Sequence, residues 1–180
     1  MALVKGTNCG FVTIAPSSDP VGDGTEPVDG YSWAFKADTP ANATKVTEIG
    51  WWCDNATEAA DFEVGIYAHD AGDDEPGALL ISSSVAKGTT AGWKKKTGLN
   101  LSVDPSTTYW IAFQVDATAT ATDTDYTTDA GESRDWVNST TNLPSPWGDS
   151  NASLGRLFAV YAVVETSSDE GTQDNVCYVY

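Results

Sequence analysis

Four carboxylates lie close together in a polar stretch of the chain, where they could bind a metal ion. They are Asp70, Asp73, Asp74 and Glu75. A hard cation such as Ca²⁺ takes about six to eight oxygen ligands, and neighbouring carboxylates can supply several of them. The stretch lacks the regular Asp spacing of a helix–loop–helix calcium loop. Two expectations therefore stand side by side: a structural calcium ion, or an acidic turn that is only solvated.

Aromatic rings could bind sugars by stacking, and the chain contains 7 Trp residues. Trp147 lies between residues 144 and 148, where two prolines are expected to present its ring on a stiff turn. Trp136 lies in a long polar segment, and Trp52 has the opposite strand parity to Trp51. These features predict that Trp52, Trp136 and Trp147 bind a glycan or a protein partner. The alternative for Trp147 is that its ring covers one end of the fold.

Catalysis would need a reactive centre, and the sequence offers few candidates for one. The chain has one histidine, His69, so a Ser-His-Asp triad or a multi-His metal site would have to use it. Glycoside hydrolysis needs a carboxyl with a raised pKa, but nearly all Asp and Glu residues lie in polar sequence where no such shift is expected. Glu63 alternates with Phe62 and Val64, which predicts that it faces solvent. We therefore expect no catalytic residue and no enzymatic activity.

The charge balance excludes two classes of partner. With 9 Lys and Arg against 26 Asp and Glu, the formal net charge is −17. Binding to nucleic acid requires clustered basic residues, and an anionic membrane surface would repel an acidic chain. No apolar run approaches the length of a membrane span. The one basic run, Lys94 to Lys96, is expected to protect an edge strand or to meet an acidic neighbour.

The cysteines and the composition point to different compartments. The 3 Cys are an odd number, which fits reduced, buried thiols, although a Cys9–Cys53 disulfide is the alternative. The first residues do not resemble a signal peptide, which indicates synthesis in the cytosol. The abundance of Thr, Ser, Asp and Gly instead looks extracellular, and a virion component would combine both properties. Five Asn-x-Ser/Thr sequons are expected by chance in a chain of this composition.

Apolar residues alternate with polar ones along most of the chain, which predicts β-strands rather than helices. Turn residues recur at intervals between these segments. The pattern favours an all-β fold, an antiparallel β-sandwich or jelly roll with about eight or nine strands. The expected strands lie near residues 11–14, 31–36, 44–53, 62–67, 79–85, 93–101, 109–115, 157–164 and 176–180, and the segment 93–101 is expected to be broken near Gly98.

Two polar segments interrupt the strand pattern. Residues 116–155 are predicted to form a long loop with at most one or two short strands, near residues 134–137. Residues 166–175 read as an acidic linker that follows a sandwich domain of residues 1–165. The linker leads to a β-forming segment that either closes the domain's own sheet or pairs with a partner. That segment consists of Val176, Cys177, Tyr178, Val179 and Tyr180.

Four strings of residues occur in an order that resembles a known module. They are Val64-Gly65-Ile66-Tyr67, then Pro76-Gly77-Ala78-Leu79-Leu80, then Gly92-Trp93, then Thr108-Tyr109-Trp110-Ile111-Ala112. The order is similar to that of a jelly-roll module found on secreted bacterial surface proteins and phage particles. The start of the chain, residues 6–12, also resembles small phage-associated proteins. The resemblance implies an adhesive or structural role and brings no catalytic residues.

These observations lead to two functional hypotheses. The first is a non-enzymatic structural protein of the virion surface, such as a phage head-decoration or fibre subunit. Its partners would be other copies of itself or capsid and tail proteins. The alternative is a carbohydrate-binding module that recognises a surface polysaccharide through its exposed Trp residues. The expected location is the virion surface in the first case and the extracellular space in the second.

Overall fold

The computed structural model describes residues 1–55, 57–129, 134–138, 141–148 and 155–167. All regular structure in these ranges is β-strand, which confirms the predicted all-β class. Branched and aromatic residues recur in the strands of residues 31–38, 43–53 and 108–115, and Gly, Pro, Asp and Ser separate many of the strands. The strands are β1 (Gly10–Val12), β2 (Gly24–Pro27), β3 (Tyr31–Asp38), β4 (Ala43–Cys53), β5 (Asp61–Asp70), β6 (Glu75–Ala86), β7 (Gly92–Ser102), β8 (Thr108–Val115), β9 (Asp123–Thr128), β10 (Arg134–Asn138), β11 (Arg156–Phe158) and β12 (Val160–Thr166).

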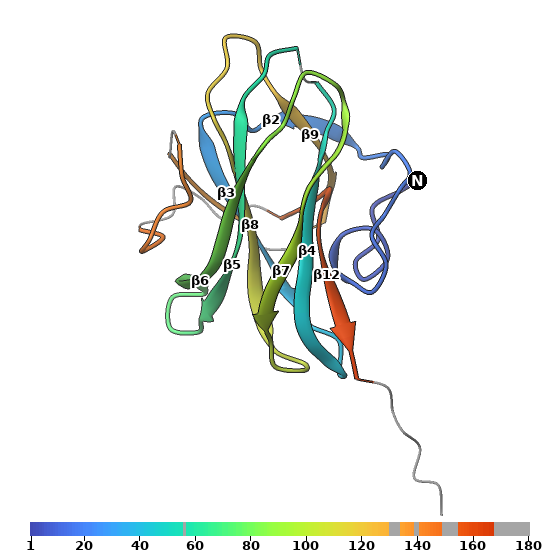
Figure 1. Cartoon of the computed structure of the whole chain (residues 1–180), viewed down its shortest axis with the longest axis vertical. Helices are drawn as coiled ribbons and strands as arrows, with labels where there is room; N and C mark the ends of the chain where they lie inside the picture. Colours follow the sequence, from blue (N-terminus) through green and yellow to red (C-terminus); the bar gives the residue numbers. More distant parts are fainter. Residues whose placement is uncertain (56, 130–133, 139–140, 149–154, 168–180) are drawn as a thin grey trace, which may run out of the picture.

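Two sheets pack face to face as a sandwich, and a smaller sheet lies at one end (Figure 1). The four-stranded sheet has the order β1-β12-β4-β7, and the five-stranded sheet has the order β10-β3-β8-β5-β6. The three-stranded sheet, β11-β9-β2, caps the end drawn at the top of Figure 1. All strand pairs are antiparallel except β1 with β12.

The strand order is that of a jelly roll. Eight strands form the two main layers when β10 is set aside: β1, β3, β4, β5, β6, β7, β8 and β12. Taken in chain order, the first, eighth, third and sixth form one layer, and the second, seventh, fourth and fifth form the other. The predicted all-β sandwich or jelly roll is therefore confirmed, and the structure adds the strand order, which was not predicted.

The main core lies between the two sheets and is rich in aromatic rings. Trp51 of β4 stacks on Phe113 of β8 with a centroid distance of 5.1 Å, so these rings join the two layers. Each ring is fully buried, as is Ile111 on the same face of β8. Burial of side chains of this size contributes about 1.5–3 kcal/mol each, which makes this layer the main source of stability.

The outer face of the five-stranded sheet is also apolar. Residues next to the core positions, such as Ala34, Tyr67 and Trp110, point away from the sandwich interior and are nevertheless buried. They need a cover, and residues 141–148 supply it. We call these eight residues the strap.

The segment 116–155 is more ordered than its polar sequence predicts. It contains β9 and β10 besides the strap; one or two short strands were expected, but only near residues 134–137, where β10 lies. Strand β9 has few apolar residues, but Thr124 within it is fully buried between β2 and β11. The strand β7 also continues through Gly98, where a φ of 74° and a register shift against β4 form a bulge instead of a break.

Candidate functional site

Trp147 is buried by its own chain. Its side chain is 3% exposed and its ring meets Tyr67 edge-on, with 5.0 Å between the centroids. The Tyr67 hydroxyl donates a hydrogen bond of 2.6 Å to the carbonyl oxygen of Pro144, and burial raises the pKa of this phenol. The prediction of an exposed Trp147 platform is therefore wrong. The ring covers part of the fold, because the outer face of the sheet would otherwise expose large apolar surface to water.

Glu63 holds the other half of the strap. Its Oε2 atom accepts a hydrogen bond of 2.5 Å from the backbone N–H of Leu143, and the side chain is buried. Gly65 leaves the space for this contact, since a Cβ atom there would lie 2.7 Å from Leu143 Cδ1 and from the Ile81 carbonyl oxygen. The prediction that Glu63 faces solvent is wrong, although its parity is right, because the outer face of the sheet is covered.

Trp52 is buried as well, on the outer face of the four-stranded sheet. It packs edge-on against Trp93 with 5.5 Å between the centroids, and it joins a small cluster with Leu3 and Cys9 of the N-terminal segment. Trp93 Nε1 donates a hydrogen bond of 2.9 Å to the Ser18 carbonyl oxygen. Opposite parity does direct Trp52 outward, but residues of the N-terminal segment cover it, so it is not an exposed ligand-binding ring.

Tyr161 completes this second aromatic cluster. The ring lies across Gly50, where an added Cβ atom would be 2.6 Å from it. The hydroxyl donates a 2.6 Å hydrogen bond to Glu48 Oε1, and Glu48 Oε1 also lies 3.4 Å from Lys95 Nζ. Burial, and then the hydrogen bond to Glu48, raises the pKa of Tyr161. These contacts join Tyr161 to the cluster of Trp52 and Trp93. They also give the Glu48 carboxylate two partners, Tyr161 and Lys95.

Two groups of predicted site residues fall where the structure gives little or no description. Strand β10 places the Trp136 backbone opposite Trp33 of β3, but its side chain lies outside the described residues. The predicted partner strand, with Val176, Cys177, Tyr178, Val179 and Tyr180, also lies outside them. Their predicted roles remain predictions.

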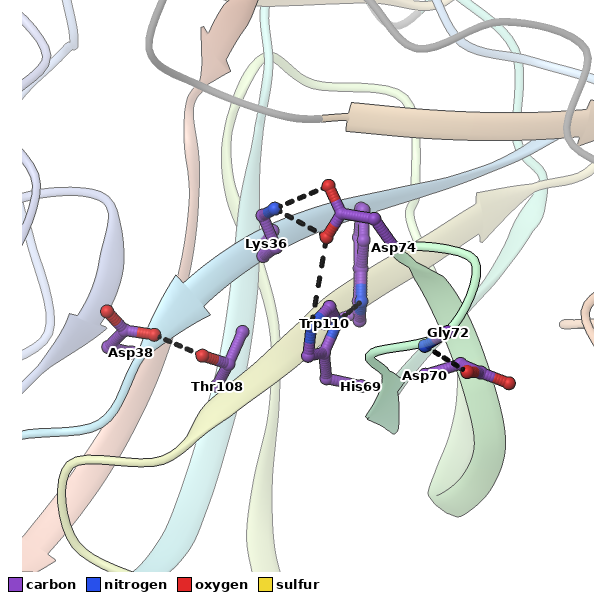
Figure 2. A network of polar contacts seen from close by, with 8 residues as sticks. All are labelled: Lys36, Asp38, His69, Asp70, Gly72, Asp74, Thr108 and Trp110. Atoms are coloured by element: carbon purple, nitrogen blue, oxygen red, sulfur yellow. Dashed lines mark hydrogen bonds and ion pairs between the residues drawn. The ribbon is translucent and has the colours of Figure 1, made fainter.

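The four clustered carboxylates lie at the β5–β6 hairpin, and the two shown in Figure 2 point to separate partners. Asp74 Oδ1 and Oδ2 accept hydrogen bonds of 2.7 and 2.8 Å from Lys36 Nζ of β3. Asp70 Oδ1 instead accepts a 2.9 Å hydrogen bond from the backbone N–H of Gly72. No group of three or more His, Cys, Asp and Glu in the described ranges is placed to hold a metal ion. The hairpin is therefore built as an ion-paired turn, and the calcium expectation gains no geometric support from it.

His69 links the hairpin to the outer face of the sheet (Figure 2). Its Nδ1 atom accepts a 3.2 Å hydrogen bond from Trp110 Nε1, and its Nε2 atom lies 3.7 Å from Asp74 Oδ1. Lys36 Nζ lies 5.9 Å from the centre of the Trp110 ring, within the range of a cation–π contact. Farther along the same sheet, the Thr108 hydroxyl donates a hydrogen bond to Asp38 Oδ1. The arrangement orients the buried Trp110 and the β5–β6 hairpin, and the described contacts of His69 include an Asp but no Ser or Cys nucleophile.

A second acidic group lies at the end of the molecule formed by β9. Burial, together with the negative charges of Asp54 and Asp19, raises the pKa of Asp125 to about 6. The pKa of Asp123 is also raised, by burial and then by Asp54. Nearly all carboxyls were expected to keep an ordinary pKa because they lie in polar sequence, and these two do not. The fold brings together acidic residues that are distant in the sequence, such as Asp19, Asp54 and Asp125.

Cys53 lies on β4 and the lysine run on the neighbouring edge strand β7, whereas Cys9 packs near Trp52. Cys9 and Cys53 are both buried and do not form a disulfide with each other, so the reduced-thiol alternative is the one that the structure supports. Burial raises the pKa of Cys53 to about 11, which keeps the thiol protonated and unreactive. Burial also lowers the pKa of Lys94, which lies on the edge strand β7. The lysine run thus lies on an edge strand, as expected.

Comparison with known proteins adds no assignment: no family model, no curated protein and no solved structure matches the chain. Within the described part of the chain, no helix is long and apolar enough to cross a membrane.

Proposed function

We propose that the chain is a non-enzymatic structural subunit of a virion surface, such as a phage head-decoration or fibre protein, that acts by packing against other subunits. One observation carries the proposal. Both outer faces of the jelly roll are covered by the chain's own segments, which are the strap on one side and N-terminal residues on the other. The outer edges of the two main sheets are then the features through which further protein can be added.

The aromatic residues support a structural role over sugar binding. Of the three Trp residues predicted to bind glycans, Trp52 and Trp147 are buried in packing clusters. A sugar stacks on a ring face that is open to solvent. In the carbohydrate-binding alternative, Trp136 would therefore have to supply an exposed ring face. The structural proposal needs no such ring.

The charge of the molecule suits repeated display on a particle. A net charge of −17 makes free copies repel each other and keeps assembled particles soluble. The narrower assignment to a virion, as opposed to another surface, depends on the sequence resemblance to phage-associated modules. A structural role depends only on the fold and on its covered faces.

Particle association tests the proposal. Virions purified from the source of the chain would be examined by immuno-electron microscopy with an antibody against it, and by quantitative mass spectrometry. We expect many copies per particle at regular positions on the surface. Absence from particles, together with titratable binding of a polysaccharide that Trp136→Ala abolishes, would replace the proposal with the carbohydrate-binding alternative.

A further inference from the structure

Strand β6 is an open sheet edge without the usual protection. It is the last strand of the five-stranded sheet, and within the described residues it pairs only with β5. Residues 78–86 of this strand contain no charged residue and no proline. Exposed edge strands of this kind present unpaired N–H and C=O groups to any other extended segment, and most proteins block them with Lys, Pro or bulges.

Strand β7, at the edge of the four-stranded sheet, is protected against strand addition, whereas β6 is not. Strand β7 carries Lys94, Lys95 and Lys96 and is interrupted by the bulge at Gly98. Strand β6 has its own register irregularities opposite residues 66–69 of β5, but residues 81–86 pair with residues 61–66 without a shift. These six residues form a regular ladder of sufficient length for one added strand.

The side chains along this ladder leave room for apolar partners. Ile81 and Val85 face the main core but are only partly buried, because no strand lies beyond them. On the other face Ser82 and Ser84 are small and exposed. An added strand would bury more of Ile81 and Val85 if its own inward residues were branched or aromatic.

The segment 176–180 has the matching chemistry. Its residues alternate in the required way, with Val176, Tyr178 and Tyr180 on one side and Cys177 and Val179 on the other. It carries no charged side chain, whereas the linker before it carries Asp169, Glu170 and Asp174. Of the residues outside the described ranges, this is the longest run of strongly β-forming side chains.

The geometry favours a second copy as the source of the segment. Strand β12 ends at Thr166, opposite Ala43, whereas β6 ends at the other end of the sandwich, where Ala86 pairs with Asp61. An antiparallel strand on β6 must begin beside Ala86. The path within one molecule would run the length of β5, roughly 33 Å, and also cross two strands and the gap of about 10 Å between sheets. The linker residues 167–175 reach at most about 32 Å, so they are too short.

We propose that residues 81–86 of β6 accept the segment 176–180 of a second copy as an added antiparallel strand. This inference names the partner within the structural function proposed above and therefore rests on it. The exchange is reciprocal in a closed dimer, whereas a head-to-tail exchange produces a ring or a filament. A decoration or fibre subunit would use either arrangement to join neighbouring copies.

Sedimentation of the full chain over a concentration series tests the exchange. We expect the full chain to form a species of twice the monomer mass or more, and a chain that ends at Asn175 to remain monomeric. The double variant S82K/S84K adds two charges to exposed positions of β6 and should also be monomeric. The matched control T97K/N100K adds the same charges to exposed positions of β7 and should assemble as the unmodified chain does.

A labelled synthetic peptide with the sequence of residues 176–180 provides a second readout. We expect it to bind the chain that ends at Asn175 and to bind the S82K/S84K form of that chain about tenfold more weakly, a loss of about 1.4 kcal/mol. Circular dichroism would check that each variant remains folded. A monomeric full chain, equal peptide binding by both forms, or an equal loss of assembly in the β7 control would each overturn the inference.

The two proposals fail in different ways. If the chain is found on virions but the form that ends at Asn175 binds them and assembles equally well, the strand exchange is wrong and the structural function stands. If the purified chain assembles through β6 but is absent from virions, the exchange stands and the proposed function is wrong.

Discussion

Asp125 titrates in a folded environment that disfavours its charge. Its pKa is about 6 in the folded chain and 3.8 in the reference state, because burial and the charges of Asp54 and Asp19 oppose ionisation. Between these values the folded state binds more protons than the unfolded state, so stability falls as the pH rises. We predict that the thermal midpoint is higher at pH 5 than at pH 7, and that Asp125→Asn raises it at pH 7.

Circular dichroism melts at several pH values check this prediction. Asp73→Asn is the control, because Asp73 is exposed at the β5–β6 hairpin and its substitution removes the same charge from the chain. An equal gain at pH 7 from both variants would mean that overall charge, and not the environment of Asp125, causes the effect.

Trp147 contributes stability and not ligand binding. Replacing a buried Trp with Ala costs about 3–5 kcal/mol because apolar burial is lost and a cavity remains. We predict a loss of this size for Trp147→Ala in urea unfolding, whereas Tyr67→Phe, which removes only the hydrogen bond to Pro144, costs about 1 kcal/mol. A stability unchanged by Trp147→Ala would show that the ring does not pack on the sheet in solution.

One half of the strap is attached through the Glu63 carboxylate, and the other half through Tyr67 and the packing of Trp147. Glu63→Ala leaves the Leu143 N–H without its acceptor and costs about 1–3 kcal/mol if the group stays buried. The strap can open instead, so we predict faster hydrogen exchange at Leu143 while exchange in β8 stays the same. Glu63→Gln keeps an acceptor oxygen and should show a smaller effect. Exchange that rises equally in β8 would mean that the strap and the core unfold together.

The strands of the main layers could be predicted because each carries its own signal. Tyr31, Trp33 and Phe35 alternate in β3, and the branched and aromatic run of β8 is equally clear. Strands β2 and β9 could not, because Thr and Asp residues gave no apolar rhythm and their pairing depends on contacts between distant segments.

Exposure could not be predicted from parity alone. The alternation in β4 and β5 correctly placed Trp52 and Glu63 on outer faces. Whether an outer face is wet depends on what lies over it, and here residues from the start of the chain and from the strap cover it. That information is tertiary, so both side chains were expected in solvent and both are buried.

The whole molecule carries far more negative than positive charge. With a net charge of −17, the compact state suffers repulsion that the expanded chain partly relieves. Salt screens such repulsion over a Debye length of about 10 Å at 0.1 M and about 3 Å at 1 M. We predict that the thermal midpoint at pH 7 rises when NaCl is increased from about 0.01 to about 0.5 M. A midpoint that falls would indicate that ion pairs such as Lys36–Asp74 outweigh the repulsion.

The proposed surface role is tested most directly by the location of the chain on the particle. Immuno-electron microscopy of native virions measures that location directly. We predict label at regularly repeated positions on the outside of the particle, in many copies. Label that is absent from every particle, with the chain recovered only as a free monomer, would contradict it.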